Sequence, residues 1–108
     1  MALGYVNDPA YAAALVQKRL RQGRGRRLIG QELGSKGISD EMLGEALGTI
    51  ETEEELRSAV DLAGRLVRRH EAEPPARRRE KVLAALARRG FSGHVGREAL
   101  ARALEDAD

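Results

Sequence analysis

The feature that most constrains this 108-residue chain is an internal repeat. When residues 29–50 are moved along the sequence by 53 positions, identical residues coincide at the pairs Leu33/Leu86, Gly37/Gly90 and Ser39/Ser92. The sequence Glu-Ala-Leu at 45–47 also coincides with the same three letters at 98–100. A repeated unit of this size buries little surface alone and gains stability by stacking on its neighbour. We therefore expect two similar modules in an elongated array.

Composition indicates an all-α fold, because Ala, Leu, Glu and Arg dominate and runs of aromatic or β-branched residues are missing. We expect a lead at residues 1–7, a three-helix module at 8–50 and a second at 51–108, with a Pro-Pro loop at 74–75 inside the second. The six predicted helices run from Pro9 to about Gln22, Arg26 to Lys36, Asp40 to Ile50, Thr52 to Glu71, Ala76 to Arg89, and Ser92 to about Glu105.

Capping residues set most of these boundaries. Asp8 precedes a proline, which is a strong signal for a helix start, and Ser39 and Ser92 are N-cap candidates. Thr52 and Glu55 have the spacing of a capping box. The repeated glycines at positions 37 and 90 are candidates for left-handed C-caps.

Several function classes find no support in the sequence. The chain has no cysteine, which excludes disulfides and thiol catalysis and suits a reducing, cytoplasmic compartment. His70 and His94 lack the spacing of a helical metal pair, and we expect a packed or capping His70 and an exposed His94. No nucleotide-binding motif, nucleophile elbow or membrane-spanning run is present. We expect a protein that is not an enzyme and that needs neither a metal nor a cofactor.

Charge is strongly segregated along the chain although the net charge is only +2. Residues 18–27 hold six basic residues and no acid, and residues 65–89 hold nine basic residues and three acids. Residues 40–61 hold eight acids and one base. Local fields of this kind govern association more than the total charge does. The candidate partner-binding residues are Arg19, Arg21, Arg24, Arg26, Arg27, Lys36, Arg65, Arg68, Arg69, Arg77, Arg78, Lys81, Arg88 and Arg89.

Two of these positions leave alternatives open. Arg19 falls on the apolar arc of its helix, so its stem either reaches out to cap carbonyls or holds a functional guanidinium rigid by packing. The loop at residues 23–27 either presents amides and guanidiniums to an anion or is a flexible basic loop with no ligand.

An arginine-rich surface suits either an acidic protein surface or nucleic acid. The helix-Gly-helix units are similar to a helix-turn-helix, whose last helix enters the major groove. Here that helix begins with Asp40 and Glu41, which phosphates repel, so sequence-specific DNA binding is disfavoured. Nonspecific contact with single- or double-stranded DNA through the basic faces remains the rival hypothesis.

Several short motifs occur in order along the chain. These are Asp8-Pro9-Ala10-Tyr11-Ala12, the run from Arg19 to Gly25, Ile29, Glu32-Leu33, Lys36-Gly37-Ile38, Ala46-Leu47 and the run from Leu86 to Ser92. Together they resemble the RecX regulators of bacterial recombination. The resemblance covers about residues 8–104 and agrees in order, spacing and repeat.

The resemblance implies a regulator that binds RecA filaments and inhibits the recombinase, ATPase and coprotease activities of RecA, in DNA repair and the SOS response. The family is built of tandem three-helix modules, usually three, so a chain with two resembles a form that lacks the first. An elongated helical array with basic faces suits a polymeric partner, because weak contacts at several modules add through effective concentration.

Overall fold

A computed structural model describes residues 8–106 of the chain. Within that range the secondary structure is helical throughout, with no strand, which confirms the predicted fold class. The six helices are α1 (Pro9–Arg21), α2 (Arg26–Ser35), α3 (Asp40–Gly48), α4 (Thr52–Arg69), α5 (Pro75–Arg88) and α6 (Gly93–Asp106).

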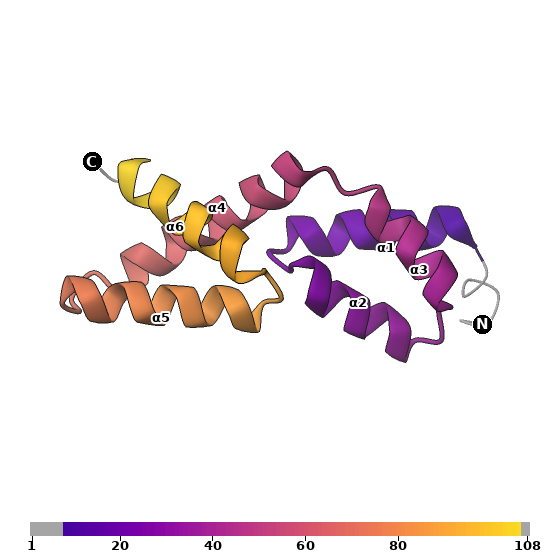
Figure 1. The fold of residues 1–108 in the computed structure, drawn as a ribbon, viewed down its shortest axis with the longest axis horizontal. Helices are drawn as coiled ribbons and strands as arrows, with labels where there is room; N and C mark the ends of the chain where they lie inside the picture. The colour runs from indigo at the N-terminus through magenta and orange to yellow at the C-terminus, as the bar shows by residue number, and fades with distance from the viewer. Residues whose placement is uncertain (1–7, 107–108) are drawn as a thin grey trace.

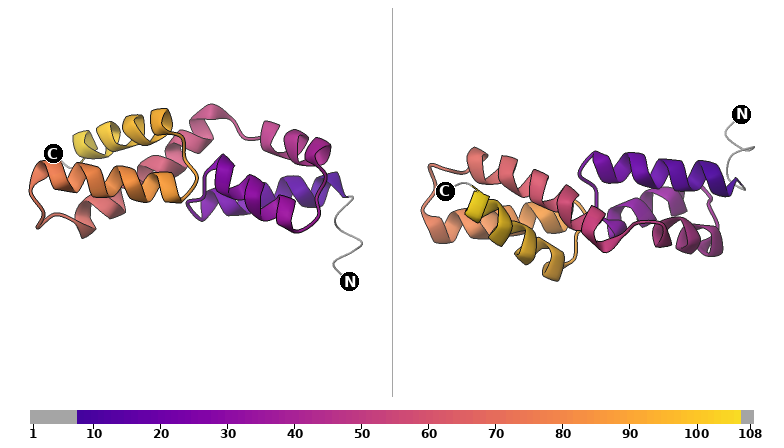
Figure 2. Two further views of the ribbon diagram at one scale, coloured as in Figure 1. Left: turned by 60° about the horizontal axis from the view of Figure 1, so that its bottom comes forward. Right: turned by 90° about the horizontal axis from the view of Figure 1, so that it is seen from above.

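The helices form two groups that follow one another end to end along the long axis of an elongated molecule of 49 × 22 × 20 Å (Figure 1). We call α1 to α3 the first unit and α4 to α6 the second unit. In the first unit α1 packs mainly on α3, and in the second α4 packs mainly on α6. The views in Figure 2 show that α4 starts over the junction and then runs away from the first unit.

Each unit has its own apolar core. The first core is centred on the fully buried Ile29 and Leu33 of α2 and includes Val16 of α1. The second is centred on Val82 and Leu86 of α5, and the remaining fully buried side chain of this size, Leu100, comes from α6. These clusters do not merge, so apolar burial holds each unit together and other contacts hold the units to each other.

Most caps follow the sequence prediction. The Asp8 carboxylate accepts hydrogen bonds from the Ala10 and Tyr11 amides at 3.0 and 3.2 Å. Ser39 and Ser92 cap α3 and α6 through bonds to the amides of the third residue after each, both 3.2 Å. Gly37 and Gly90 have φ angles of +92° and +95°, the left-handed conformation expected of them.

Helix α4 begins at Thr52 as predicted, but its predicted N-cap is wrong by one residue. Glu51, and not Thr52, is the N-cap, and the Glu51 amide donates to Glu54 Oε1 at 3.0 Å. Glu55 is therefore free of a capping role, and it is the one buried charged residue of the described chain. The helix also ends earlier than Glu71, because His70 is its C-cap. His70 is half-buried there, and His94 is exposed in the first turn of α6 as expected.

No helix within residues 8–106 combines the length and the apolar character that a membrane crossing requires.

Glycine accounts for the close approach of the two units. A Cβ on Gly25 would lie 2.5 Å from the carbonyl carbon and oxygen of Gly90, and a Cβ on Gly90 would lie 2.5 Å from the Leu28 amide nitrogen. Real Cβ atoms do not approach backbone this closely, so the backbone at both positions would have to move. The loop of the first unit and the turn of the second can touch only because both residues lack side chains.

We expect Gly90→Ala to lower the free energy of unfolding by about 1–2 kcal/mol from the left-handed φ alone, with a further loss from the clash at Leu28. The matched control is Gly34→Ala in α2, where an added Cβ meets nothing within 4 Å. Since alanine favours a helix over glycine, the control should gain up to about 1 kcal/mol. Urea unfolding measures both variants, and equal stabilities would contradict the assigned contact.

Candidate partner-binding surface

The loop between α1 and α2 forms the junction with the second unit. The Gly25 amide donates to the Arg89 carbonyl at 2.7 Å, and the Arg27 amide donates to the Gly90 carbonyl at 3.2 Å. The Arg27 guanidinium also donates to the Ala87 carbonyl near the end of α5. Both amides are therefore used inside the chain, which argues against the hypothesis that they bind an anion.

Arg26 and Glu55 tie three helices together at this junction. Glu55 is only 6 % exposed, and its carboxylate lies 3.1 Å from Arg26 Nε. The same guanidinium donates to the carbonyls of Leu47 and Ile50 at 2.7 Å each, at and just beyond the end of α3. One side chain at the start of α2 thus satisfies carbonyls left open by α3 and neutralises the carboxylate buried in α4.

Arg19 and Arg24 both pair with Glu32 of α2. Arg19 Nε and Arg24 Nη1 each lie 2.7 Å from a Glu32 oxygen, so neither guanidinium caps carbonyls as the first alternative for Arg19 predicted. Burial alone would raise the pKa of the Glu32 carboxyl, but the hydrogen bonds and positive charges of Arg19 and Arg24 outweigh it and lower that pKa. The folded chain therefore favours the ionised form of Glu32 over the protonated form more strongly than the unfolded chain does.

Three candidate residues of α5 are engaged at the turn that precedes it. Arg78 donates to the carbonyls of His70, Glu71 and Glu73 at 3.0–3.3 Å and so closes the end of α4. Arg77 and Lys81 lie 3.5 and 2.9 Å from the Glu73 carboxylate. The close contact of the Lys81 ammonium lowers the pKa of the Glu73 carboxyl.

Half of the candidate residues make no side-chain hydrogen bond or ion pair within residues 8–106. Lys36, the C-cap of α2, is one of them. Five of the others belong to α4, to the end of α5 and to its C-cap. The complete group is Arg21, Lys36, Arg65, Arg68, Arg69, Arg88 and Arg89.

Four of these arginines surround a hollow of about 310 Å³ between α4 and the end of α5, which we call the arginine hollow. The apolar side chains of Leu62, Leu66 and Ala85 complete its lining, and the lining contains no carboxylate. The arginines that line it are Arg65, Arg69, Arg88 and Arg89.

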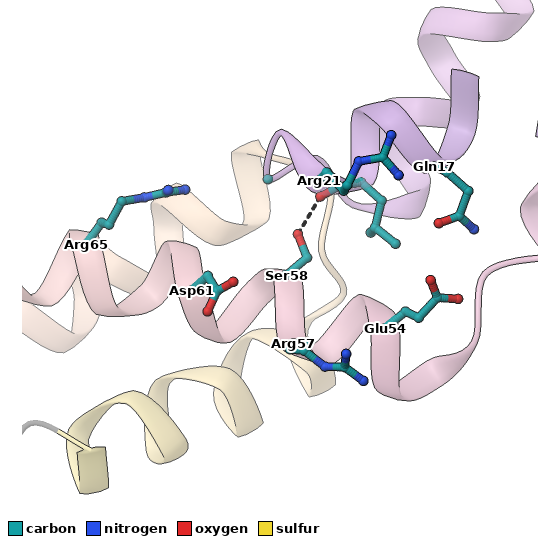
Figure 3. A pocket seen from close by; sticks show the side chains of 9 residues that line it. Gln17, Arg21, Glu54, Arg57, Ser58, Asp61 and Arg65 are labelled. Atoms are coloured by element: carbon teal, nitrogen blue, oxygen red, sulfur yellow. Dashed lines mark hydrogen bonds between the residues drawn. The ribbon is translucent and has the colours of Figure 1, made fainter. Parts of the chain in front are cut away.

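A second hollow of about 460 Å³ lies between the end of α1 and the first half of α4, and we call it the mixed-charge hollow (Figure 3). Its two helices are joined by Ser58, whose hydroxyl donates to the Leu20 carbonyl at 2.6 Å. Arg65 lines both hollows, so they adjoin. The charged side chains that line it are Arg21, Glu54, Arg57, Asp61 and Arg65.

Sequence reasoning missed Arg57 and Asp61. Together with Arg65 and Arg69 they are spaced four residues apart along α4, which places all four on one face of the helix. That spacing is visible in the sequence. Counting charges over residues 40–61 hides it, because Arg57 is the single base among eight acids there.

These observations define the class of the protein: tandem three-helix units that expose unpaired arginines around shallow hollows, an arrangement suited to binding another macromolecule. Residues 7–47 match the second three-helix domain of RecX, and residues 53–100 match the third. The chain therefore belongs to the RecX family.

Curated relatives agree with that assignment. The regulatory protein RecX of Streptomyces coelicolor is 33% identical over 106 residues, which cover 96% of this chain and 56% of the relative. That of Mycobacterium marinum is 36% identical over 99 residues, covering 90% and 57%. That of Levilactobacillus brevis is 33% identical over 101 residues, covering 93% and 38%. The chain thus spans between about two fifths and three fifths of their lengths.

A crystal structure of regulatory protein RecX has the same fold, with a TM-score of 0.77 and 36% sequence identity over 82% of this chain and 44% of that one. The relatives are regulatory proteins and not enzymes, in agreement with the non-enzymatic prediction.

We expect Glu55→Gln to lower the free energy of unfolding by about 1–3 kcal/mol, because it removes the charge opposite Arg26 in a buried position. Glu53→Gln is the matched control, since Glu53 pairs with Arg102 in an exposed position and should leave the unfolding midpoint unchanged. Urea unfolding at neutral pH compares the two, and equal effects would count against the structural role of Glu55.

The lowered pKa of Glu32 predicts a pH dependence. The carboxylate contributes stability that is present above its ordinary pKa of 4.5 and is lost as the pH falls through the lower folded value. Glu32→Gln should therefore be less stable than the natural chain at pH 7, with a difference that shrinks below pH 4.5. Thermal unfolding from pH 3 to 7 measures it. Glu45→Gln, at an exposed residue without a side-chain partner within residues 8–106, is the matched control and should leave the stability at pH 7 almost unchanged.

Proposed function

We propose that this chain binds filaments of RecA and inhibits their recombinase, ATPase and coprotease activities, and so acts in DNA repair and the SOS response. Membership in a family of regulatory proteins is the observation that carries this proposal. The shape of the molecule supports it, because two units in a row over 49 Å can contact a polymer at more than one place.

The internal pairs narrow the residues that we propose as contacts. Arg19, Arg24, Arg26 and Arg78 already neutralise carboxylates or cap helices, so their share in binding would be small. The same holds for Arg77 and Lys81, which neutralise Glu73. We place the proposal on the candidates whose side chains have no partner within residues 8–106, namely Arg21, Lys36, Arg65, Arg68, Arg69, Arg88 and Arg89.

The second candidate function is nonspecific binding of single- or double-stranded DNA. The observation that favours it is the arginine hollow, which has no carboxylate in its lining. This function requires no RecA, and its affinity would fall steeply with added salt because bound cations on the DNA are released.

We expect the chain to slow ATP hydrolysis by RecA on single-stranded DNA and to sediment with the filaments. A bare single-stranded oligonucleotide, titrated with salt, is the control for DNA binding alone. The proposal would be contradicted if the chain neither slowed hydrolysis nor sedimented with filaments, and if a version with a first three-helix domain of a relative fused ahead of it also failed.

A further inference from the structure

One face of α4 carries charges of both signs, with a single carboxylate among three arginines. Arg57, Asp61, Arg65 and Arg69 follow one another at intervals of four residues, and this row passes from the mixed-charge hollow to the arginine hollow. Figure 3 shows Arg57, Asp61 and Arg65 along this helix, with Arg21 at the end of α1 above it. All four side chains of the row belong to exposed residues without a partner within residues 8–106.

The arginine hollow is an uncompensated positive site. Its four guanidiniums come from α4 and from the end of α5, and none of them has an acidic neighbour in the lining. Like charges held together in this way repel each other, and a ligand with negative charge relieves the repulsion. Guanidinium groups bind carboxylates and phosphates through paired hydrogen bonds, so the charge alone does not separate the two kinds of partner.

The lining of the mixed-charge hollow distinguishes a protein partner from a nucleic acid. This lining adds the carboxylates of Glu54 and Asp61, and Asp61 lies four residues before Arg65 on the same face of α4. A phosphodiester chain that lay along the row would pass these carboxylates and be repelled by them. A protein surface can place carboxylates against the arginines and a cation against Asp61. No aromatic side chain lines either hollow, so base stacking offers no compensation to a nucleic acid.

We propose that this face of α4 docks a protein segment of mixed charge, with carboxylates opposite the arginine hollow and a lysine or arginine opposite Asp61. The inference rests on the proposed function, in that RecA is the protein that would present the segment. The inference specifies the order of charges in that segment. It also specifies where along α4 the negative and the positive charges of the segment bind.

The test uses the full chain, labelled with a fluorophore, and measures its affinity for RecA filaments on single-stranded DNA and for the bare oligonucleotide. Reversing two arginines of the hollow, in Arg65→Glu with Arg88→Glu, should weaken filament binding by about tenfold or more. The matched control reverses the same number of charges at Arg79→Glu and Arg97→Glu, which lie outside both hollows and have no side-chain partner in the described part of the chain. It should bind almost as the natural chain does.

Asp61→Lys decides between the two kinds of partner, because it makes the row wholly positive. Docking of a mixed-charge protein segment predicts weaker filament binding for Asp61→Lys and a smaller loss for Asp61→Asn. Contact with a phosphate backbone predicts tighter binding for both variants, on filaments and on the bare oligonucleotide. That result would overturn the inference.

The remaining outcomes separate the inference from the proposed function. If the natural chain binds filaments and the variants of α4 bind equally well, the docking site is wrong while the function stands. If the natural chain does not bind filaments, the proposed function fails and this inference fails with it. Circular dichroism should show unchanged helicity for all variants, since every substituted residue lies at an exposed position of a described helix.

Discussion

The position of one unit relative to the other depends on the contact between the Gly25 loop and the Gly90 turn, reinforced by the pair of Arg26 with Glu55. The two apolar cores are separate, so burial of apolar surface does not set this relation. Backbone hydrogen bonds, the guanidiniums of Arg26 and Arg27, and the Ser58 hydroxyl set it. The junction is also connected to the candidate binding surface. The Arg89 carbonyl accepts a hydrogen bond from the Gly25 amide, and the Arg89 side chain lines the arginine hollow.

The junction is also the place where the repeat breaks down. The shift of 53 residues that aligns the glycine turns places Gly25 on Arg78 and Arg26 on Arg79. Arg78 closes the end of its own preceding helix, and Arg79 has no partner. A side chain at position 78 excludes the close backbone approach that Gly25 permits. The second unit therefore repeats the helices of the first without repeating its means of joining a neighbour.

Local features of the fold could be predicted from the sequence, and distant ones could not. Caps such as Asp8 and Ser39 act within three residues, and the glycine turns follow from the need for a positive φ. The fate of the arginines depends on partners far along the chain: Glu55 lies 29 residues from Arg26, and Ala87 lies 60 residues from Arg27. Charge blocks do not indicate which guanidiniums will meet such partners. The predicted contact residues therefore included arginines that pair within the chain as well as arginines that do not.

The two kinds of arginine have different physical roles. A guanidinium that caps α3 or pairs with Glu32 has its hydrogen bonds satisfied and stiffens the scaffold. An exposed one on the α4 row keeps its donors for a partner and gains most from carboxylates that replace water in a paired geometry. Because the net charge is only +2, long-range attraction to any polyanion is weak. Recognition must then rest on the local order of charges, and Asp61 among the arginines sets that order.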